Sequence, residues 1–187
     1  CVELLAELRM CDEHWRIEAK EASKTLGKSV SQTISAFSNE PGIEGGYLLL
    51  GVSHDQASGS YRVIGVHDPD KLQREVASLC ASAFNQSLRP NMQVCAVDEK
   101  LVIVVYIPEV EPQNKPIYIK AQGLPRGAYR RIGSTVQHCT DEDIRIFHTN
   151  AGRKTFDESI ITGASLDDID PQAIGEYRRA RRTANPH

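Results

Sequence analysis

Residues 13–20 read EHWRIEAK and residues 45–52 read GGYLLLGV, and these two runs decide the fold. In the first run apolar and charged residues alternate, which is the period of a strand with one buried face. Its apolar residues, Trp15 among them, are expected inside. Its charged residues are expected to face outward together: Arg16, Glu18 and Lys20. The second run is almost continuously apolar, as is typical of a central strand covered on both faces, and the glycines before it allow it to return beside the first.

Helical periodicity and turn residues indicate the other elements. Helices are expected over 2–10, 26–39, 70–84 and 140–150, with Asp70 and Thr140 as the N-caps of the last two. Further strands are expected over 61–66, 92–97, 101–107, 116–120 and 128–132, the second and third forming a hairpin and the last two pairing with each other. This interleaving of strands and helices predicts an α+β fold, a mixed β-sheet with helices packed on it.

The composition is that of an ordinary globular domain, with 40% hydrophobic and 25% charged residues among 187, enough chain for one medium domain with a real core. A formal net charge of −3 gives no global argument for binding nucleic acid, so any basic surface must be local. Five scattered cysteines without a CxxC pair favour a reducing, cytoplasmic setting: Cys1, Cys11, Cys80, Cys95 and Cys139. No apolar run is long enough for a membrane helix, and no signal peptide is evident, so no membrane association is expected.

The two ends of the chain suggest how it is organised. It starts at Cys1 without a methionine and ends in an arginine-rich stretch, so it reads as a piece of a longer protein. Residues 1–150 are expected to form the domain. Residues 151–187 turn acidic and then basic, and are predicted to be a linker and a C-terminal helix leading to a region that this sequence lacks.

Three acids could form a catalytic metal site. Glu13 and Glu18 lie five residues apart around the start of the first strand, and Asp55 follows the predicted central strand. Convergent carboxylates suit hard divalent cations such as Mg²⁺ or Mn²⁺, which take oxygen ligands and stabilise phosphoryl transfer. The alternative is that these acids are solvated charges paired with Arg16 or Lys20.

A set of basic residues is a candidate surface for nucleic acid. These residues lie on predicted strand edges and in adjoining loops: Lys20, Lys24, Lys28, Lys120, Arg126, Arg130 and Arg131. Lysine and arginine in such places bind backbone phosphates, with an affinity that depends on salt. Because side chains alternate along a strand, Arg130 and Arg131 are expected to point to opposite faces, so only one of them can belong to a given patch. The alternative is that these residues are solubilising surface charges.

Several of these motifs occur in the order found in a known family. The motifs are Glu13 with Glu18-Ala19-Lys20-Glu21, the helix ending Ser35-Ala36-Phe37-Ser38-Asn39, the run 45–52, the segment 129–134 and Phe156-Asp157-Glu158. Over residues 10–160 the chain resembles the Schlafen AlbA-like domain, a family described as DNA-binding.

The resemblance implies an α+β fold of that family, in a bacterial or archaeal transcriptional regulator or a RecG-like helicase relative. Vertebrate Schlafen proteins built on a similar core include RNA-cleaving members that use two glutamates and an aspartate. By position, Glu13 and Glu18 correspond to the glutamates. The aspartate of the family directly follows the Gly-Val of the central strand, where this sequence has Ser53 and His54 before Asp55. No match to the zinc ligands of Schlafen proteins is evident.

Three functions remain open from the sequence. The favoured one is a nucleic-acid-binding module of a transcriptional regulator, with DNA or RNA as partner. The second is a Schlafen-like endoribonuclease that uses Mg²⁺ or Mn²⁺ at Glu13, Glu18 and Asp55, so the sequence leaves open whether the protein is an enzyme. The third is a self-associating or ligand-sensing module without catalysis, for which a homodimer is the simplest form.

Overall fold

A computed structural model describes residues 1–10, 14–55, 59–151 and Gln172 of the chain. The chain divides into two units, Cys1–Arg153 and Lys154–His187. The fold and the site described below lie in the first unit. No helix in the described ranges is long and apolar enough to cross a bilayer.

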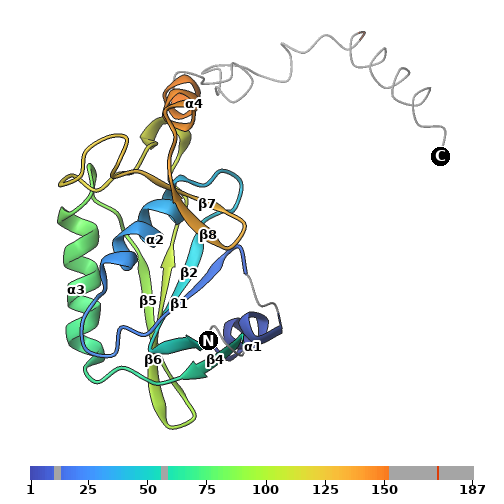
Figure 1. Cartoon of the computed structure of the whole chain (residues 1–187), viewed down its shortest axis with the longest axis vertical. Helices are drawn as coiled ribbons and strands as arrows, with labels where there is room; N and C mark the ends of the chain where they lie inside the picture. The colour runs from blue at the N-terminus through green and yellow to red at the C-terminus, as the bar shows by residue number, and fades with distance from the viewer. Residues whose placement is uncertain (11–13, 56–58, 152–171, 173–187) are drawn as a thin grey trace. The chain divides into compact units, whose positions relative to one another are not determined.

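The centre of the domain is a four-stranded mixed sheet (Figure 1). Its strands lie in the order β1 (Ile17–Lys20), β2 (Gly46–Leu50), β6 (Lys100–Ile107) and β5 (Asn91–Val97). β1 runs parallel to β2, and the other two pairings are antiparallel. The predicted α+β class, with a mixed sheet in which the second run returns beside the first, is therefore confirmed.

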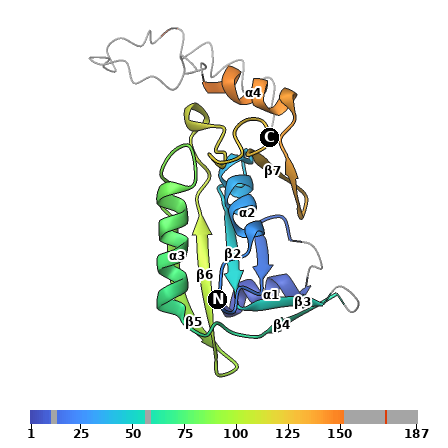
Figure 2. The ribbon, with the colours of Figure 1, turned by 60° about the vertical axis from the view of Figure 1, so that its left-hand side comes forward.

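Helices cover both faces of this sheet (Figure 2). On one face, α2 (Lys28–Asn39) and α3 (Pro69–Ser82) bury the even positions of β2 in the larger core cluster. On the other face, α1 (Val2–Met10) packs Leu5 and Leu8 against Leu49 of β2 in a second cluster. Leu48, Leu49 and Leu50 are all fully buried, as expected for a central strand covered on both sides.

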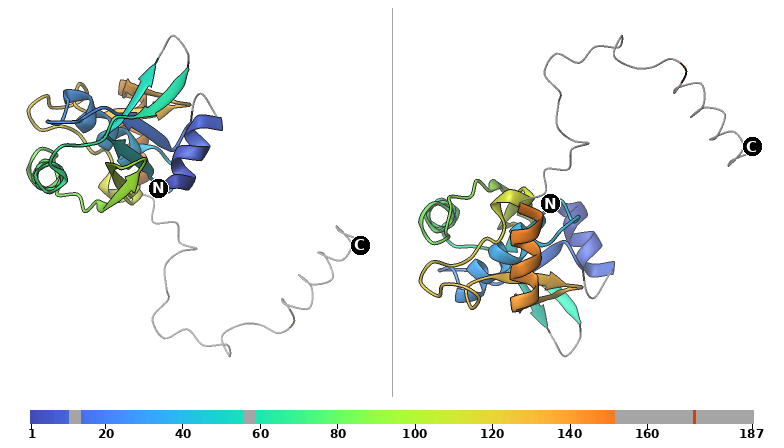
Figure 3. Two further views of the ribbon diagram at one scale, coloured as in Figure 1. Left: turned by 90° about the horizontal axis from the view of Figure 1, so that it is seen from below. Right: turned by 90° about the horizontal axis from the view of Figure 1, so that it is seen from above.

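Two hairpins and a last helix extend from this core (Figure 3). The first hairpin pairs β3 (Val52–Asp55) with β4 (Ser60–Val63), and the second pairs β7 (Tyr129–Ile132) with β8 (Thr135–His138). A short 3-10 turn, η1 (Pro112–Asn114), precedes the second hairpin, and α4 (Asp141–Ala151) follows it. The second hairpin packs on α2, so it forms a further layer over that helix.

Buried polar groups fix this second hairpin to α2. Asn39 has no exposed surface, and its side-chain amide donates to the carbonyl oxygens of Ile117 and Tyr129, both at 2.8 Å. Its side-chain oxygen accepts from the Ile117 amide at 2.6 Å. Ser35, one turn earlier, donates to the same Ile117 carbonyl and accepts from the Tyr129 amide. Buried backbone groups must find hydrogen-bond partners. These two side chains supply the hydrogen bonds that a neighbouring strand would otherwise make to residues 117 and 129.

Two predicted strands differ from the structure for local reasons. The run 45–52 breaks at Gly51, whose φ of +94° is in the region that favours glycine, and its carbonyl accepts from the Ile64 and Gly65 amides. Val52 therefore starts the β3–β4 hairpin instead of extending β2. The predicted pairing of 116–120 with 128–132 is reduced to a single bridge between Tyr118 and Ala128, because the following residues turn back to pair with β8.

Two predictions about single residues were wrong. Trp15 is 48% exposed, because β1 begins only at Ile17 and the alternation does not extend back to Trp15. The N-cap of α3 is Asp68 and not Asp70, since the Asp68 carboxylate accepts from the Lys71 amide at 2.9 Å and Pro69 occupies the first helical position. The N-cap of α4 was predicted correctly: the Thr140 hydroxyl accepts from the Asp143 amide at 3.1 Å.

Candidate functional site

Glu18 lies between two cations at the start of the sheet. Lys20 follows it on the same side of β1, and its Nζ is 2.8 Å from Glu18 Oε1. Arg131 reaches it from β7, with Nη1 at 2.8 Å from Glu18 Oε2. The charged side of β1 therefore faces the β7–β8 hairpin, and both carboxylate oxygens of Glu18 already contact a cation. The side chains of Glu18 and Lys20 are only 20% and 23% exposed, which differs from the expectation of an outward-facing charged strand.

Arg131 also joins three parts of the fold. Its side chain is 2% exposed, and its Nη2 donates to the carbonyl oxygens of His14 at 2.8 Å and Ile17 at 3.4 Å. Its guanidinium carbon lies 4.9 Å from the centre of the Phe37 ring on α2, within the range of a cation–π contact. A buried arginine with these partners holds β7, β1 and α2 together.

Arg130 points to the other side of β7, as predicted from strand alternation. Its guanidinium pairs with Glu40 at 3.2 Å and with Asp143 of α4. Asp143 also accepts from the amide and the hydroxyl of Thr140, both at 2.8 Å. Burial alone would raise the pKa of Asp143, but the hydrogen bonds from Thr140 and Arg130 outweigh burial and lower it. The charges of Arg130 and Arg131 are thus both compensated within the fold.

A small cavity of about 180 Å³ opens beside Glu18, between the two hairpins. Besides Glu18 and Arg131, its lining includes His54 of β3, Tyr61 of β4 and Ser134 of the β7–β8 turn. The rings of His54 and Tyr61 are stacked with their centres 4.4 Å apart. The cavity is therefore lined by residues of β1, β3, β4 and the second hairpin, including the ionisable side chains of Glu18, His54 and Arg131.

The three acids proposed as metal ligands are only partly covered by the described residues. Glu13 lies outside them. Among the described residues no group of three or more His, Cys, Asp or Glu side chains is arranged to hold a metal ion. Ser53, which directly follows Gly51-Val52, donates its hydroxyl to Glu21 Oε1 at 2.7 Å.

Both carboxylate oxygens of Glu18 contact cations in the structure. A Mg²⁺ or Mn²⁺ ion bound by Glu18 would have to displace Lys20 or Arg131, or lie against their like charges. Glu18 as the structure places it therefore acts as a partner of basic residues. The metal ligand set Glu13, Glu18 and Asp55 stays a prediction.

The other basic residues predicted to bind nucleic acid are exposed. Lys24, Lys28, Lys120 and Arg126 form no ion pair or side-chain hydrogen bond with any residue in the described ranges. Lys24 lies in the loop before α2 and Lys28 is the first residue of that helix. Gln32, one turn after Lys28, donates to the Tyr129 hydroxyl at 3.2 Å, and that hydroxyl donates to Gln122 at 3.1 Å. The 120–127 loop, which carries Lys120 and Arg126, is therefore tied to the first turns of α2.

Nothing in the sequence indicated that Glu40 and Asp143 would pair with Arg130. Both pairs depend on contacts between residues far apart in the chain. Glu40 directly follows the helix motif that ends in Asn39, but nothing in its spacing points to Arg130. The stacked pair His54 and Tyr61 could have been suspected from a histidine and a tyrosine on facing strands of a short hairpin.

Comparison with known proteins assigns the fold to a family. Residues 13–140 match the family described as Schlafen, AlbA_2. The chain belongs to the Schlafen AlbA_2 family. The resemblance read from the motifs is thereby confirmed over residues 13–140, and its segment 156–158 lies outside both this match and the described residues. Among curated proteins no sequence matches the chain.

Two solved structures share this Schlafen AlbA_2 fold. The first is the solution NMR structure of the N-terminal domain of an ATP-dependent DNA helicase RecG-related protein from Nitrosomonas europaea, with 56% identity and a TM-score of 0.59, covering 74% of this chain and 92% of that one. The second is the DIP2311 protein from Corynebacterium diphtheriae, with 18% identity and a TM-score of 0.52, covering 95% of this chain and 37% of that one. At this low identity the second likeness shows the fold alone.

Proposed function

We propose that this Schlafen AlbA_2 domain is a nucleic-acid-binding module that contacts backbone phosphates, and that it serves a bacterial, cytoplasmic protein acting in transcription regulation or beside a helicase. Membership of the family supports the proposal, as does the 56% identity to the N-terminal domain of a helicase-related protein. The proposal covers both DNA and RNA, because phosphate contacts do not distinguish them.

The observation that carries the proposal is the difference between paired and unpaired basic residues. Lys20, Arg130 and Arg131 contact carboxylates of the fold. The other four basic residues are exposed and lack such partners in the described ranges: Lys24, Lys28, Lys120 and Arg126. Cations that are not engaged within the protein can neutralise phosphates and release their counterions, which is the main source of affinity for nucleic acid.

The start of α2 adds a second favourable feature to this surface. Gly27 is the N-cap and provides no side-chain hydrogen bond, so the first amides of α2 have no side-chain cap. The N-terminal end of a helix carries a partial positive charge and attracts phosphate groups. Together with Lys24 and Lys28 it forms a local positive surface on a chain whose net charge is −3.

Charge reversal tests this proposal. Lys28→Glu should weaken binding of a mixed-sequence DNA or RNA oligonucleotide several-fold at low salt, measured by fluorescence anisotropy. Arg9→Glu is the matched control, because it changes the net charge equally from α1, on the opposite face of the sheet. Equal effects of the two changes would show a response to net charge alone and would contradict the proposed surface.

Self-association remains part of the proposal. β5 is a terminal strand of the four-stranded sheet, and its seven residues leave one edge for pairing in the described part of the chain. We expect a homodimer in which this edge pairs with a second copy. Light scattering that gives the mass of a monomer at all protein concentrations would contradict it.

A further inference from the structure

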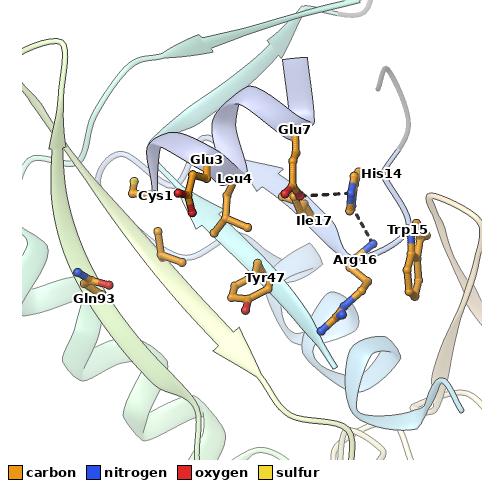
Figure 4. A pocket seen from close by; sticks show the side chains of 11 residues that line it. Cys1, Glu3, Leu4, Glu7, His14, Trp15, Arg16, Ile17, Tyr47 and Gln93 are labelled. Carbon is orange, nitrogen blue, oxygen red and sulfur yellow. Dashed lines mark hydrogen bonds and ion pairs between the residues drawn. The ribbon is translucent and has the colours of Figure 1, made fainter. Parts of the chain in front are cut away.

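A cavity of about 570 Å³ lies between α1 and the sheet, on the face opposite α2 (Figure 4). α1 provides Glu3 and Glu7 to its lining, the segment before β1 provides Trp15 and Arg16, and the sheet provides Tyr47 and Gln93. Its volume is within the range of about 300–1,000 Å³ of sites for small organic groups. None of the roles assigned above uses this cavity.

Flat groups suited to stacking line one side of the cavity. Trp15 is 48% exposed, and the Arg16 guanidinium lies over its ring with the guanidinium carbon 5.6 Å from the ring centre. Arg16 is held in place because its Nε donates to the Gly45 carbonyl at 3.2 Å. The Tyr47 ring is supported by Tyr106, with ring centres 5.1 Å apart. Exposed aromatic rings and guanidinium planes are the groups on which unpaired bases stack.

The charges that line the cavity indicate which kind of ligand it can bind. Glu3 and Glu7 place two carboxylates in the lining against the single guanidinium of Arg16, and Gln93 adds an amide. Glu7 Oε2 also lies 3.7 Å from His14 Nε2. Such a lining repels a phosphate and favours a flat group with N–H donors. The exocyclic amines of adenine, cytosine and guanine are donors of this kind, and carboxylates accept from them. Thymine and uracil lack an exocyclic amine.

The cavity adjoins the smaller cavity beside Glu18. His14 and Ile17 line both this cavity and the smaller one that contains Glu18 and Arg131. A base within a duplex cannot reach such a cavity unless it is unpaired.

We propose that the cavity between α1 and the sheet binds one unpaired base of single-stranded nucleic acid, with adenine, cytosine or guanine preferred over thymine or uracil. This inference rests on the proposed function and names the form of nucleic acid that the domain takes. The stacking groups are Trp15, Arg16 and Tyr47, and the carboxylates of Glu3 and Glu7 accept from the amine of the base.

The single tryptophan of the chain is Trp15, so its fluorescence reports on this cavity directly. The test titrates the protein with four nucleic acids of equal length: oligoadenylate, oligothymidylate, an abasic single strand and a duplex. Oligoadenylate should quench the emission of Trp15 and bind about tenfold more tightly than the abasic strand, because a base can stack on the aromatic lining. Oligothymidylate should bind more weakly than oligoadenylate, and the duplex should not quench.

Variants separate the cavity from the phosphate surface. The double change Glu3→Gln and Glu7→Gln should remove most of the preference for oligoadenylate over oligothymidylate. Glu99→Gln, an exposed acid at the β5–β6 turn, is the control and should leave the preference intact.

The outcomes distinguish this inference from the proposed function. Equal binding of all strands without quenching of Trp15 would overturn the base site and leave the phosphate surface standing. Quenching by an arginine-rich peptide but by no strand would overturn it in favour of a protein partner. Failure of every strand to bind would contradict the proposed function itself.

Discussion

Arg131 Nη1 lies 2.8 Å from Glu18 Oε2, although 113 residues separate the two in the chain. This ion pair connects the second hairpin to the first strand of the sheet, and Lys20 holds the other oxygen of the same carboxylate. Glu18 is therefore important to the fold, whatever else it contacts in a complex.

Glu18→Gln should lower the free energy of unfolding by about 3 kcal/mol, because it leaves the buried guanidinium of Arg131 without its counter-charge. Lys20→Gln, which removes the other and less buried pair, should cost about 1 kcal/mol or less. Urea unfolding of the three proteins measures both values. Equal losses in the two variants would show that the pair with Arg131 stabilises the fold no more than the pair with Lys20.

Asn39→Ala should be among the most damaging changes on α2. It removes three hydrogen bonds to the buried backbone of residues 117 and 129. Ser35 still donates to the Ile117 carbonyl, but the Ile117 amide and the Tyr129 carbonyl lose Asn39 as their partner. We expect a loss of about 3 kcal/mol or more in the free energy of unfolding. Asn85→Ala is the control, since Asn85 makes two hydrogen bonds to the neighbouring residues 116 and 118 but is exposed to water. A loss at Asn85 as large as at Asn39 would contradict the role of burial.

Gly45 and Gly42 both have positive φ, of +95° and +76°, but only Gly45 is crowded. A Cβ at Gly45 would lie 2.1 Å from the Ile107 carbonyl oxygen, whereas a Cβ at Gly42 meets nothing within 4 Å. Gly42→Ala should therefore cost only the backbone strain, about 1–2 kcal/mol. Gly45→Ala should cost clearly more, as a larger drop in melting temperature. Similar melting temperatures for the two variants would contradict the close packing of β2 against β6.

The Asp143 carboxylate should make stability depend on pH in the acid range. Its pKa in the folded protein is below the ordinary 3.8, so the unfolded chain binds a proton more readily. The resulting stabilisation is complete above pH 3.8 and is lost as the pH falls through the lower folded value. Asp143→Asn should flatten this part of the pH profile of the melting temperature. An unchanged acid limb in the variant would contradict the assignment to Asp143.

Much of the fold could be predicted from local patterns. The runs 13–20 and 45–52 indicated adjacent strands, and the helical periodicity located α1, α2 and α4 within a few residues. Errors arose where one residue ends an element: Gly51 turns the chain out of the sheet, and Asp68 takes the N-cap position that was assigned to Asp70. Trp15 was predicted to be buried because the alternation of apolar and charged residues starts there, two residues before the strand begins at Ile17.

Less of the candidate site than of the fold could be predicted from the sequence. The basic residues were identified, but their division into paired and unpaired ones depends on Glu18, Glu40 and Asp143, which reach them through contacts across the fold. The cavity beside Trp15 likewise forms only when α1 packs on the sheet. Long-range contacts of this kind leave no period or spacing in the sequence.

The salt dependence of binding tests the central claim most directly. Binding of a single-stranded oligonucleotide is measured against salt concentration for the native chain and for Lys24→Gln with Lys28→Gln. If both lysines contact phosphates, the slope of log K against log salt should become shallower by roughly 0.7 for each lost contact. An unchanged slope in the double variant would contradict the account that the exposed lysines at the start of α2 bind the nucleic-acid backbone.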